Sequence, residues 1–281
     1  IETYLGDYYS VVEEISQRVE REQRKNAQLK KQILDRKEKV NFFANKGGKM
    51  RKLAKKLKDE TAELEEAMVD VRQEDRTIRE FMIPAQDIAG EIVKISAVKV
   101  IYNHEPVIKE VNKIIRKKMK LLVIGPNGVG KSTFLRSLAA GKNEQAEILK
   151  ETRVGYYSQD FSNLDFSQTV FDSLASALMT GTDTQTMRSV AAGFLISGDL
   201  MGRKVNELSE GQKGLLSFAR LTLMRPGLLI LDEPTNHINF RHLPVIAKAL
   251  NEYQGAMIMV SHMSDFVKQI KFDDDLNLGK V

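Results

Sequence analysis

One short stretch constrains this chain more than any other: Gly125-Pro-Asn-Gly-Val-Gly-Lys-Ser132, which directly follows the apolar run Leu121-Leu-Val-Ile124. Its pattern is Gly-x4-Gly-Lys-Ser, in the strand-loop-helix setting that a phosphate-binding loop requires. The glycines allow backbone N–H groups to turn inward around phosphates, and the N-terminus of the following helix adds a favourable dipole. We therefore expect a nucleoside triphosphate to bind here, with Lys131 neutralising phosphate charge and the Ser132 hydroxyl ligating Mg²⁺.

The expected nucleotide-binding residues of this loop and its flank are Gly125, Pro126, Asn127, Gly128, Val129, Gly130, Lys131, Ser132 and Thr133.

Two acids end a second apolar run, Leu228-Leu-Ile-Leu231, as Asp232-Glu233. An Asp at the carboxyl end of a core strand, opposite a phosphate loop, is placed to hold Mg²⁺ directly or through water. The adjacent Glu233 is placed to orient or deprotonate the attacking water. Taken alone, two such acids are more often surface residues; together with the phosphate loop they predict a hydrolytic site.

The apolar runs also predict the fold class. Leu121–Ile124, Leu228–Leu231 and Ala256–Val260 are separated by helical stretches, which is typical of an α/β domain with a largely parallel core sheet. Before them, Glu91–Ser96 and Val98–Tyr102 alternate in polarity and predict short strands. We expect this domain to span residues 86–281, with a helical subdomain at about 160–220.

The first 85 residues have a different pattern. No Pro or Gly interrupts the chain from Asp7 to Ala44, and apolar residues recur at heptad-like spacing before and after Gly47-Gly48. This predicts a long antiparallel α-helical hairpin, a coiled coil, over residues 1–85. Between Lys30 and Lys58 lie twelve cations and two acids, so the expected tip is strongly basic. Such local basicity indicates contact with a polyanion; a solvated helix face is the alternative.

Composition limits the function classes. The net charge of the 281-residue chain is only +5, and the chain contains no Cys, which excludes disulfides and thiolate metal sites. It has no run of eighteen apolar residues, so we expect no membrane partner and a cytoplasmic location. Because the first residue is Ile and no secretory pattern follows, we expect the chain to be a piece of a longer protein.

A further motif points to a family. Leu208-Ser-Glu-Gly-Gln-Lys213 resembles the Leu-Ser-Gly-Gly-Gln signature of ATP-binding cassette (ABC) ATPases, and the resemblance extends over residues 91–281. Gln159 matches the family's Q-loop, His262 its switch histidine, and Tyr102 its adenine-stacking aromatic residue, although Tyr102 can also be an ordinary strand tyrosine.

The resemblance implies a P-loop ABC ATPase that uses ATP and Mg²⁺, with three sets of site residues. The implied catalytic residues are Glu233, His262 and Gln159, and the implied metal ligands are Ser132, Asp232 and Gln159. Tyr102 joins the nucleotide-binding set, and Ser209, Gly211 and Gln212 serve an ATP held by a partner. In this family two domains sandwich two ATP molecules, so this chain is expected to hold half of each composite site. It needs the first ABC domain of the same full-length chain, or a second copy.

Three positions depart from the family pattern. Glu210 stands where the signature usually has glycine, Asn239 where the D-loop usually has Asp, and Met263 where Asp usually follows the switch histidine. None of them touches the phosphate loop, Asp232 or Glu233. We therefore expect ATP binding to be kept, while the rate of hydrolysis depends on these departures.

The order of the parts distinguishes between kinds of ABC protein. Only 84 positions separate Gly125 from Ser209, which leaves no room there for an inserted coiled coil, and the predicted hairpin precedes the ATPase domain. The continuation Asp232-Glu-Pro-Thr-Asn-His237 resembles the ABC-F subfamily. The opening Tyr4-Leu-Gly-Asp-Tyr-Tyr-Ser10 resembles the segment that follows the first domain in that family, and the stretch Phe42–Lys58 resembles the tip of its interdomain linker, the P-site tRNA interaction motif.

The ABC-F resemblance implies an ATPase that acts on the ribosome, with its basic hairpin contacting rRNA and tRNA near the P site. The cations expected to meet RNA are Lys46, Lys49, Arg51, Lys52, Lys55, Lys56 and Lys58. The alternative is an ATPase subunit of a transport or DNA-maintenance complex whose hairpin binds a protein partner.

Overall fold

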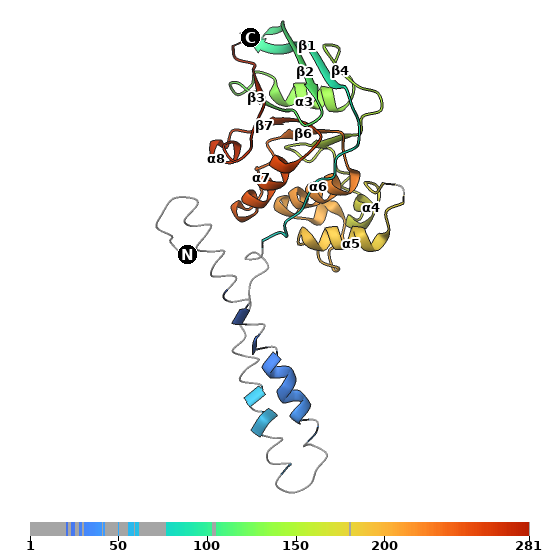
Figure 1. Ribbon diagram of the computed structural model, residues 1–281, viewed down its shortest axis with the longest axis vertical. Helices are drawn as coiled ribbons and strands as arrows, with labels where there is room; N and C mark the ends of the chain where they lie inside the picture. Colours follow the sequence, from blue (N-terminus) through green and yellow to red (C-terminus); the bar gives the residue numbers. More distant parts are fainter. Residues whose placement is uncertain are drawn as a thin grey trace. The chain divides into compact units, whose positions relative to one another are not determined.

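The computed structural model describes residues 21, 24–25, 28–29, 31–40, 42, 50, 56–58, 60–61, 77–102, 105–179 and 181–280. By its internal contacts the chain forms two compact units, Ile1–Thr77 and Ile78–Val281 (Figure 1). Residues 78–85, which the sequence pattern assigned to the hairpin, fall in the second unit. Within the described parts of the chain, no helix is long and apolar enough to cross a membrane.

The second unit contains a five-stranded sheet in the order β5-β6-β7-β3-β8, in which every neighbouring pair is parallel. Its strands are β5 (Val154–Tyr157), β6 (Leu228–Asp232), β7 (Ala256–Val260), β3 (Lys120–Ile124) and β8 (Asp274–Asn277). All five residues of β6 and of β7 are buried, as expected for strands covered on both faces. The predicted parallel core sheet is confirmed. The carboxyl ends of β3, β6 and β7 therefore lie at one edge.

A second sheet of three antiparallel strands has the order β2-β1-β4. It consists of β1 (Glu91–Tyr102), β2 (Glu105–Arg116) and β4 (Ala146–Ile148). The two short strands predicted from Glu91–Ser96 and Val98–Tyr102 are thus one strand of twelve residues, and that prediction was wrong. The register shifts between Ile95 and Ala97, which lets the neighbours Ala97 and Val98 both be buried. The bulge interrupts the alternation of buried and exposed side chains, and in the sequence this interruption looks like the end of one strand and the start of another.

Six α-helices are described in this unit: α3 (Lys131–Ala139), α4 (Val170–Ala175), α5 (Thr184–Gly193), α6 (Glu210–Met224), α7 (Leu243–Glu252) and α8 (Ser264–Val267). Two 3-10 turns, η2 (Val205–Glu207) and η3 (Phe240–His242), accompany them. Side chains of Thr169, Asp183 and Ser209 accept hydrogen bonds at the starts of α4, α5 and α6. Figure 1 shows α4, α5 and α6 grouped away from β1 and β2.

Residues 78–89, here called the strap, form neither a helix nor a strand. They are held by contacts with the rest of this unit. Arg79 N–H donates to Gly193 O at 2.9 Å, and Gln86 N–H donates to Pro226 O at 3.0 Å. The Phe81 ring lies edge-on to Phe194, with 4.6 Å between the ring centroids. The strap therefore packs against the second unit, although the sequence pattern assigned residues 78–85 to the hairpin.

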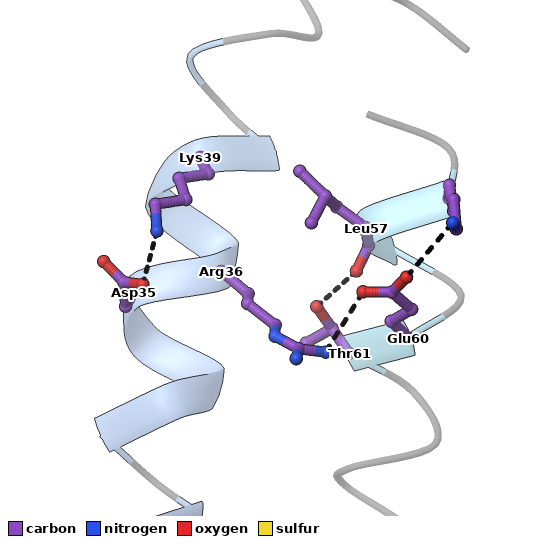
Figure 2. Close-up of polar contacts among 7 residues, drawn as sticks. Asp35, Arg36, Lys39, Leu57, Glu60 and Thr61 are labelled. Atoms are coloured by element: carbon purple, nitrogen blue, oxygen red, sulfur yellow. Dashed lines mark hydrogen bonds and ion pairs between the residues drawn. The ribbon is translucent and has the colours of Figure 1, made fainter. Parts of the chain in front are cut away.

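In the first unit, every described residue from 21 to 61 is helical, and the longest described stretch is 31–40. Figure 2 shows the contact between this stretch and residues 60–61: Arg36 Nη1 lies 3.3 Å from Glu60 Oε2. Ile33 and Thr61 are buried, and the Thr61 hydroxyl donates to Leu57 O at 2.6 Å. The long antiparallel hairpin stays a prediction, because Gly47-Gly48 and much of both arms lie outside the described residues.

Most of the cations expected to meet RNA, namely Lys46, Lys49, Arg51, Lys52 and Lys55, also lie outside the described residues. Lys56 and Lys58 are described, and both are exposed. Lys56 Nζ lies 3.9 Å from Glu60 Oε1, one turn along the helix.

Candidate functional site

The phosphate loop joins β3 to α3. Gly125, Gly128 and Gly130 have φ angles of 151°, 79° and 109°, a backbone region that side chains disfavour. A Cβ at Gly125 would also lie 3.2 Å from Val129 Cγ1 and 3.3 Å from the backbone N of Gly279. Glycine is thus required here both by conformation and by space. The result is the strand-loop-helix that the motif predicted.

Lys131 begins α3 and is buried, with 7% of its surface exposed. Its Nζ donates to Gly125 O at 2.8 Å and to Pro126 O at 3.0 Å. Burial lowers the pKa of Lys131, and the nearby charges of Glu233 and Asp232 oppose that shift. The ammonium is therefore held inside the loop, in the position from which it can reach a phosphate.

Asp232 ends β6 and is only 1% exposed. The Ser132 hydroxyl donates to its Oδ1 at 3.0 Å. Burial raises the pKa of Asp232, and the Ser132 hydrogen bond opposes that shift. A hydroxyl and a carboxylate that converge from two elements are the hard oxygen ligands that Mg²⁺ prefers. No group of three or more His, Asp and Glu side chains suited to a metal occurs among the described residues, so the rest of a Mg²⁺ shell would come from phosphate, water and neutral side-chain oxygens.

Glu233 follows with a φ angle of 49°, a left-handed conformation that is uncommon for a residue other than glycine. Its N–H donates to Val260 O at 3.0 Å, and its Oε2 accepts from the backbone N–H of His262 at 3.1 Å. His262 Nε2 lies 3.3 Å from the other oxygen, Oε1. Oε1 is buried and has no hydrogen-bond partner within the described parts of the chain. The side chain is thus fixed through one oxygen while the other is left available.

Lys131, Ser132, Glu233 and His262 line one pocket of about 460 Å³, whereas Asp232 is not among its lining residues. Its lining residues are Asn127, Gly128, Gly130, Lys131, Ser132, Thr133, Gln159, Glu233, Asn236, Val260 and His262. The pocket brings together residues from the phosphate loop, the Q-loop position, the segment after β6 and the end of β7. Asn236 was missed as a lining residue; its position four residues after the end of β6 was the available signal.

A second pocket, of about 590 Å³, shares Gly130 and Thr133 with the first. Ile101, Pro106, Ile108 and Phe134 form apolar parts of its wall, and Lys142–Gln145 add polar groups. Ile101 N–H donates to Val129 O at 3.0 Å, which ties the end of β1 to the phosphate loop. Tyr102 is 67% exposed and does not line this pocket, whereas its neighbour Ile101 does. A stacking role for Tyr102 stays a prediction.

The signature residues lie elsewhere. Ser209 precedes α6, and its hydroxyl accepts from Gln212 N–H at 3.2 Å while Gln212 Oε1 accepts from Ser209 N–H at 3.0 Å. This reciprocal capping box satisfies two backbone donors at the helix start. Ser209, Gly211 and Gln212 line neither pocket. Within this chain the signature and the phosphate loop are therefore separate sites.

The sequence is similar to those of known ATP-binding proteins. The profile of a family described as ABC transporter matches residues 108–236. The probable ATP-binding protein YbiT of Escherichia coli O157:H7 is 30% identical over 277 residues, which cover 96% of this chain and 51% of that protein. A probable ATP-binding cassette sub-family F member 3 homolog of Encephalitozoon cuniculi (strain GB-M1) is 30% identical over 272 residues, covering 95% and 47%. The chain spans about half the length of these curated relatives.

Among solved structures, the fold is similar to an archaeal ribosome recycling factor determined in complex with an archaeal ribosomal stalk protein. The TM-score is 0.52 at 21% identity, over 69% of this chain and 38% of that one. At this identity the likeness concerns the fold.

Proposed function

Since the chain belongs to the ABC-F group of ATP-binding cassette ATPases, we propose that it binds ATP with Mg²⁺ and hydrolyses it once a second cassette domain completes the site. The observation that carries this proposal is the pocket that joins the phosphate loop to Glu233 and His262. ABC ATPase domains bind ATP as a class, and the pocket supplies the groups that the chemistry needs.

The binding half of the site consists of the phosphate loop and two ligands for Mg²⁺. The loop's N–H groups and the buried Lys131 ammonium neutralise phosphate charge. Ser132 Oγ and Asp232 Oδ1, which are 3.0 Å apart, are the proposed Mg²⁺ ligands, and Gln159 at the pocket rim is the proposed third. When bound, Mg²⁺ supplies charge neutralisation at the phosphate oxygens.

The catalytic half of the site consists of Glu233 and His262. Glu233 Oε1 accepts a hydrogen bond, and then a proton, from the attacking water. The His262 backbone N–H holds the second oxygen at 3.1 Å, so that the carboxylate does not rotate away from the water. His262 Nε2 lies 3.3 Å from Oε1, where it can steady the same water or the phosphate oxygens.

The signature residues are proposed to act on another domain's ATP. Ser209, Gly211 and Gln212 lie at the start of α6, whose first N–H groups favour anions. Because they line neither pocket of this chain, they are free to face a partner, which is either the first cassette domain of a longer protein or a second copy.

The ribosome is the proposed target of the whole protein. The basic stretch between Lys30 and Lys58 suits RNA phosphates. One relative is named as an ATP-binding cassette sub-family F member 3 homolog, and one fold neighbour is described as a ribosome recycling factor. ATP-driven closure of the two domains would then control how the basic hairpin contacts rRNA and tRNA near the P site, in the cytoplasm. The cassette motifs alone do not distinguish this from a transport or DNA-maintenance partner.

The test is to neutralise four cations of the basic stretch, Lys49, Lys52, Lys55 and Lys56, to Gln. Each lost phosphate contact removes about 0.7–0.9 from the slope of log affinity against log salt, so we expect weaker and less salt-dependent ribosome binding. Glutamine forms helices about as well as lysine, so folding should persist.

The matched control makes the same change at four exposed lysines of the ATPase unit, Lys94, Lys109, Lys204 and Lys271. It should leave both the affinity and the slope nearly unchanged. Equal effects of the two sets would assign the binding to net charge alone, and no effect of the first set would favour a protein partner for the hairpin. ATP affinity should be the same in all three proteins.

A further inference from the structure

The signature of this chain contains a charge that its proposed role does not favour. Glu210 is the first residue of α6, between Ser209 and Gly211, and 60% of its side chain is exposed. Under the proposed function, a partner's ATP phosphates approach this helix start. A free carboxylate at this place would repel them, because like charges at close range destabilise an interface.

The Glu210 carboxylate contacts a histidine side chain. His237 Nδ1 lies 2.7 Å from Glu210 Oε2. The two residues come from different motifs, the signature before α6 and the loop that follows β6. Lys213 lies about one turn further along α6, but it does not pair with Glu210. Its ammonium lies over the Phe166 ring instead, 5.2 Å from the centroid. In the described parts of the chain, His237 is therefore the side-chain partner that Glu210 has.

The position of His237 is set by its surroundings as well as by the ion pair. Its φ angle is 63°, in the left-handed region, and its ring centroid lies 6.3 Å from that of Phe161. Its backbone O would lie 3.1 Å from a Cβ at Gly211, and Ile238 Cδ1 would lie 2.5 Å from a Cβ at Gly214. The loop after β6 thus packs tightly against α6, which brings the His237 ring to Glu210.

We propose that His237 is a positioning residue for the composite site. It pairs with Glu210 and holds that carboxylate against the loop after β6, which leaves Ser209 and Gly211 able to accept a partner's phosphates. This inference rests on the proposed function, because only the action of the signature on another domain's ATP places phosphate at the start of α6. His237 does not touch the chain's own nucleotide pocket, so its effect is confined to assembly.

The experiment measures ATP-driven self-association of the chain by sedimentation velocity. A Glu233→Gln parent is used so that ATP is not consumed during the run. His237→Ala removes the imidazole and leaves the carboxylate unpaired; we expect the concentration for half-association to rise about tenfold. His237→Asn is the matched control, because Asn keeps an N–H donor and tolerates the left-handed region. It should stay within about threefold of the parent.

The decisive variant is the double substitution Glu210→Gln with His237→Ala. If His237 acts by pairing with the Glu210 carboxylate, removal of that carboxylate should restore association to within about threefold of the parent. If the double variant associates as poorly as His237→Ala, the histidine only supports the loop and the proposal is wrong. The proposal also fails if His237→Ala associates like the parent.

The binding of a fluorescent ATP analogue to monomeric protein, in the same variants, should be unchanged. If the Glu233→Gln parent itself binds ATP but does not associate, it is the proposed composite site that fails, and the role of His237 fails with it. That result differs from a failure confined to the His237 variants.

Discussion

The two halves of the proposed ATP site differ in how the chain holds them. On the phosphate side, Lys131, Asp232 and Glu233 are 7%, 1% and 7% exposed, and the residues around them come from four separate stretches of sequence. On the signature side, Ser209 and Gln212 are satisfied by each other in a local capping box. One half is buried and built by long-range packing, whereas the other is exposed and built by four consecutive residues.

This difference has a physical reason. Buried ionisable groups are stable only when they are paired or hydrogen-bonded, so the phosphate side requires the whole parallel sheet to place its partners. A helix start needs only its own cap to stay ordered, and it can then present free N–H groups to an anion outside the chain. Under the proposed function, this difference suits a domain that binds its nucleotide alone and gives its signature to another domain.

The largest expected effect comes from Glu233→Gln, which tests whether the phosphate side of the site contains the catalytic base. The amide keeps the shape of the side chain and leaves Ser132 and Asp232 unchanged. It removes the base, which costs about 10²- to 10⁴-fold in turnover, while ATP affinity should persist. Steady-state ATPase and equilibrium ATP binding measure the two quantities. Hydrolysis at the parent rate would remove Glu233 from the role of general base.

A smaller effect is expected from Phe81→Ala in the strap, which tests whether the helical group is separable from the phosphate pocket. Phe81 packs on Phe194 at 4.6 Å and on Phe218 at 6.3 Å between ring centroids. Truncation should lower the free energy of unfolding by about 3 kcal/mol, the lower end for Phe→Ala, because the ring is only partly buried.

The adjacent Met82, 72% exposed, gives the matched control Met82→Ala, which should change stability by less than about 0.5 kcal/mol. Denaturant titration measures both. The folded Phe81→Ala protein should bind ATP as the parent does, since the strap does not line the nucleotide pocket. A parallel loss of ATP affinity would show that the two regions are one unit.

The parts of the site that the sequence predicted are those encoded locally. Gly-x4-Gly-Lys-Ser after an apolar run requires a strand, a loop and a helix in that order, and the structure has them. Asp232 and Glu233 were placed at a strand end by the run before them. Gln159 and His262 were expected only from the family resemblance, and the parallel sheet, whose carboxyl edge is shared by β3, β6 and β7, accounts for their place in the same pocket as Glu233.

The parts that were not predicted depend on contacts between distant segments. Nothing in the residues around Glu210 indicates His237, which lies 27 positions later and meets it only after α6 packs on the loop. Ile101 and Ile108 lie in the wall of the second pocket because the antiparallel pairing of β1 with β2 brings them close together. Residues 78–85 of the strap were assigned to the hairpin, and the packing of Phe81 on Phe194 and the hydrogen bond from Arg79 to Gly193 place them against the helical group instead.

The most direct test of the central claim is the ATPase rate per chain measured as a function of chain concentration. If the phosphate side is complete and the signature acts only on another domain, the specific rate should be very low in dilute solution. It should rise with concentration, or with an added first cassette domain, until the composite sites are filled. A full rate that stays constant down to dilute chain would show that a single domain is sufficient, and would contradict this account.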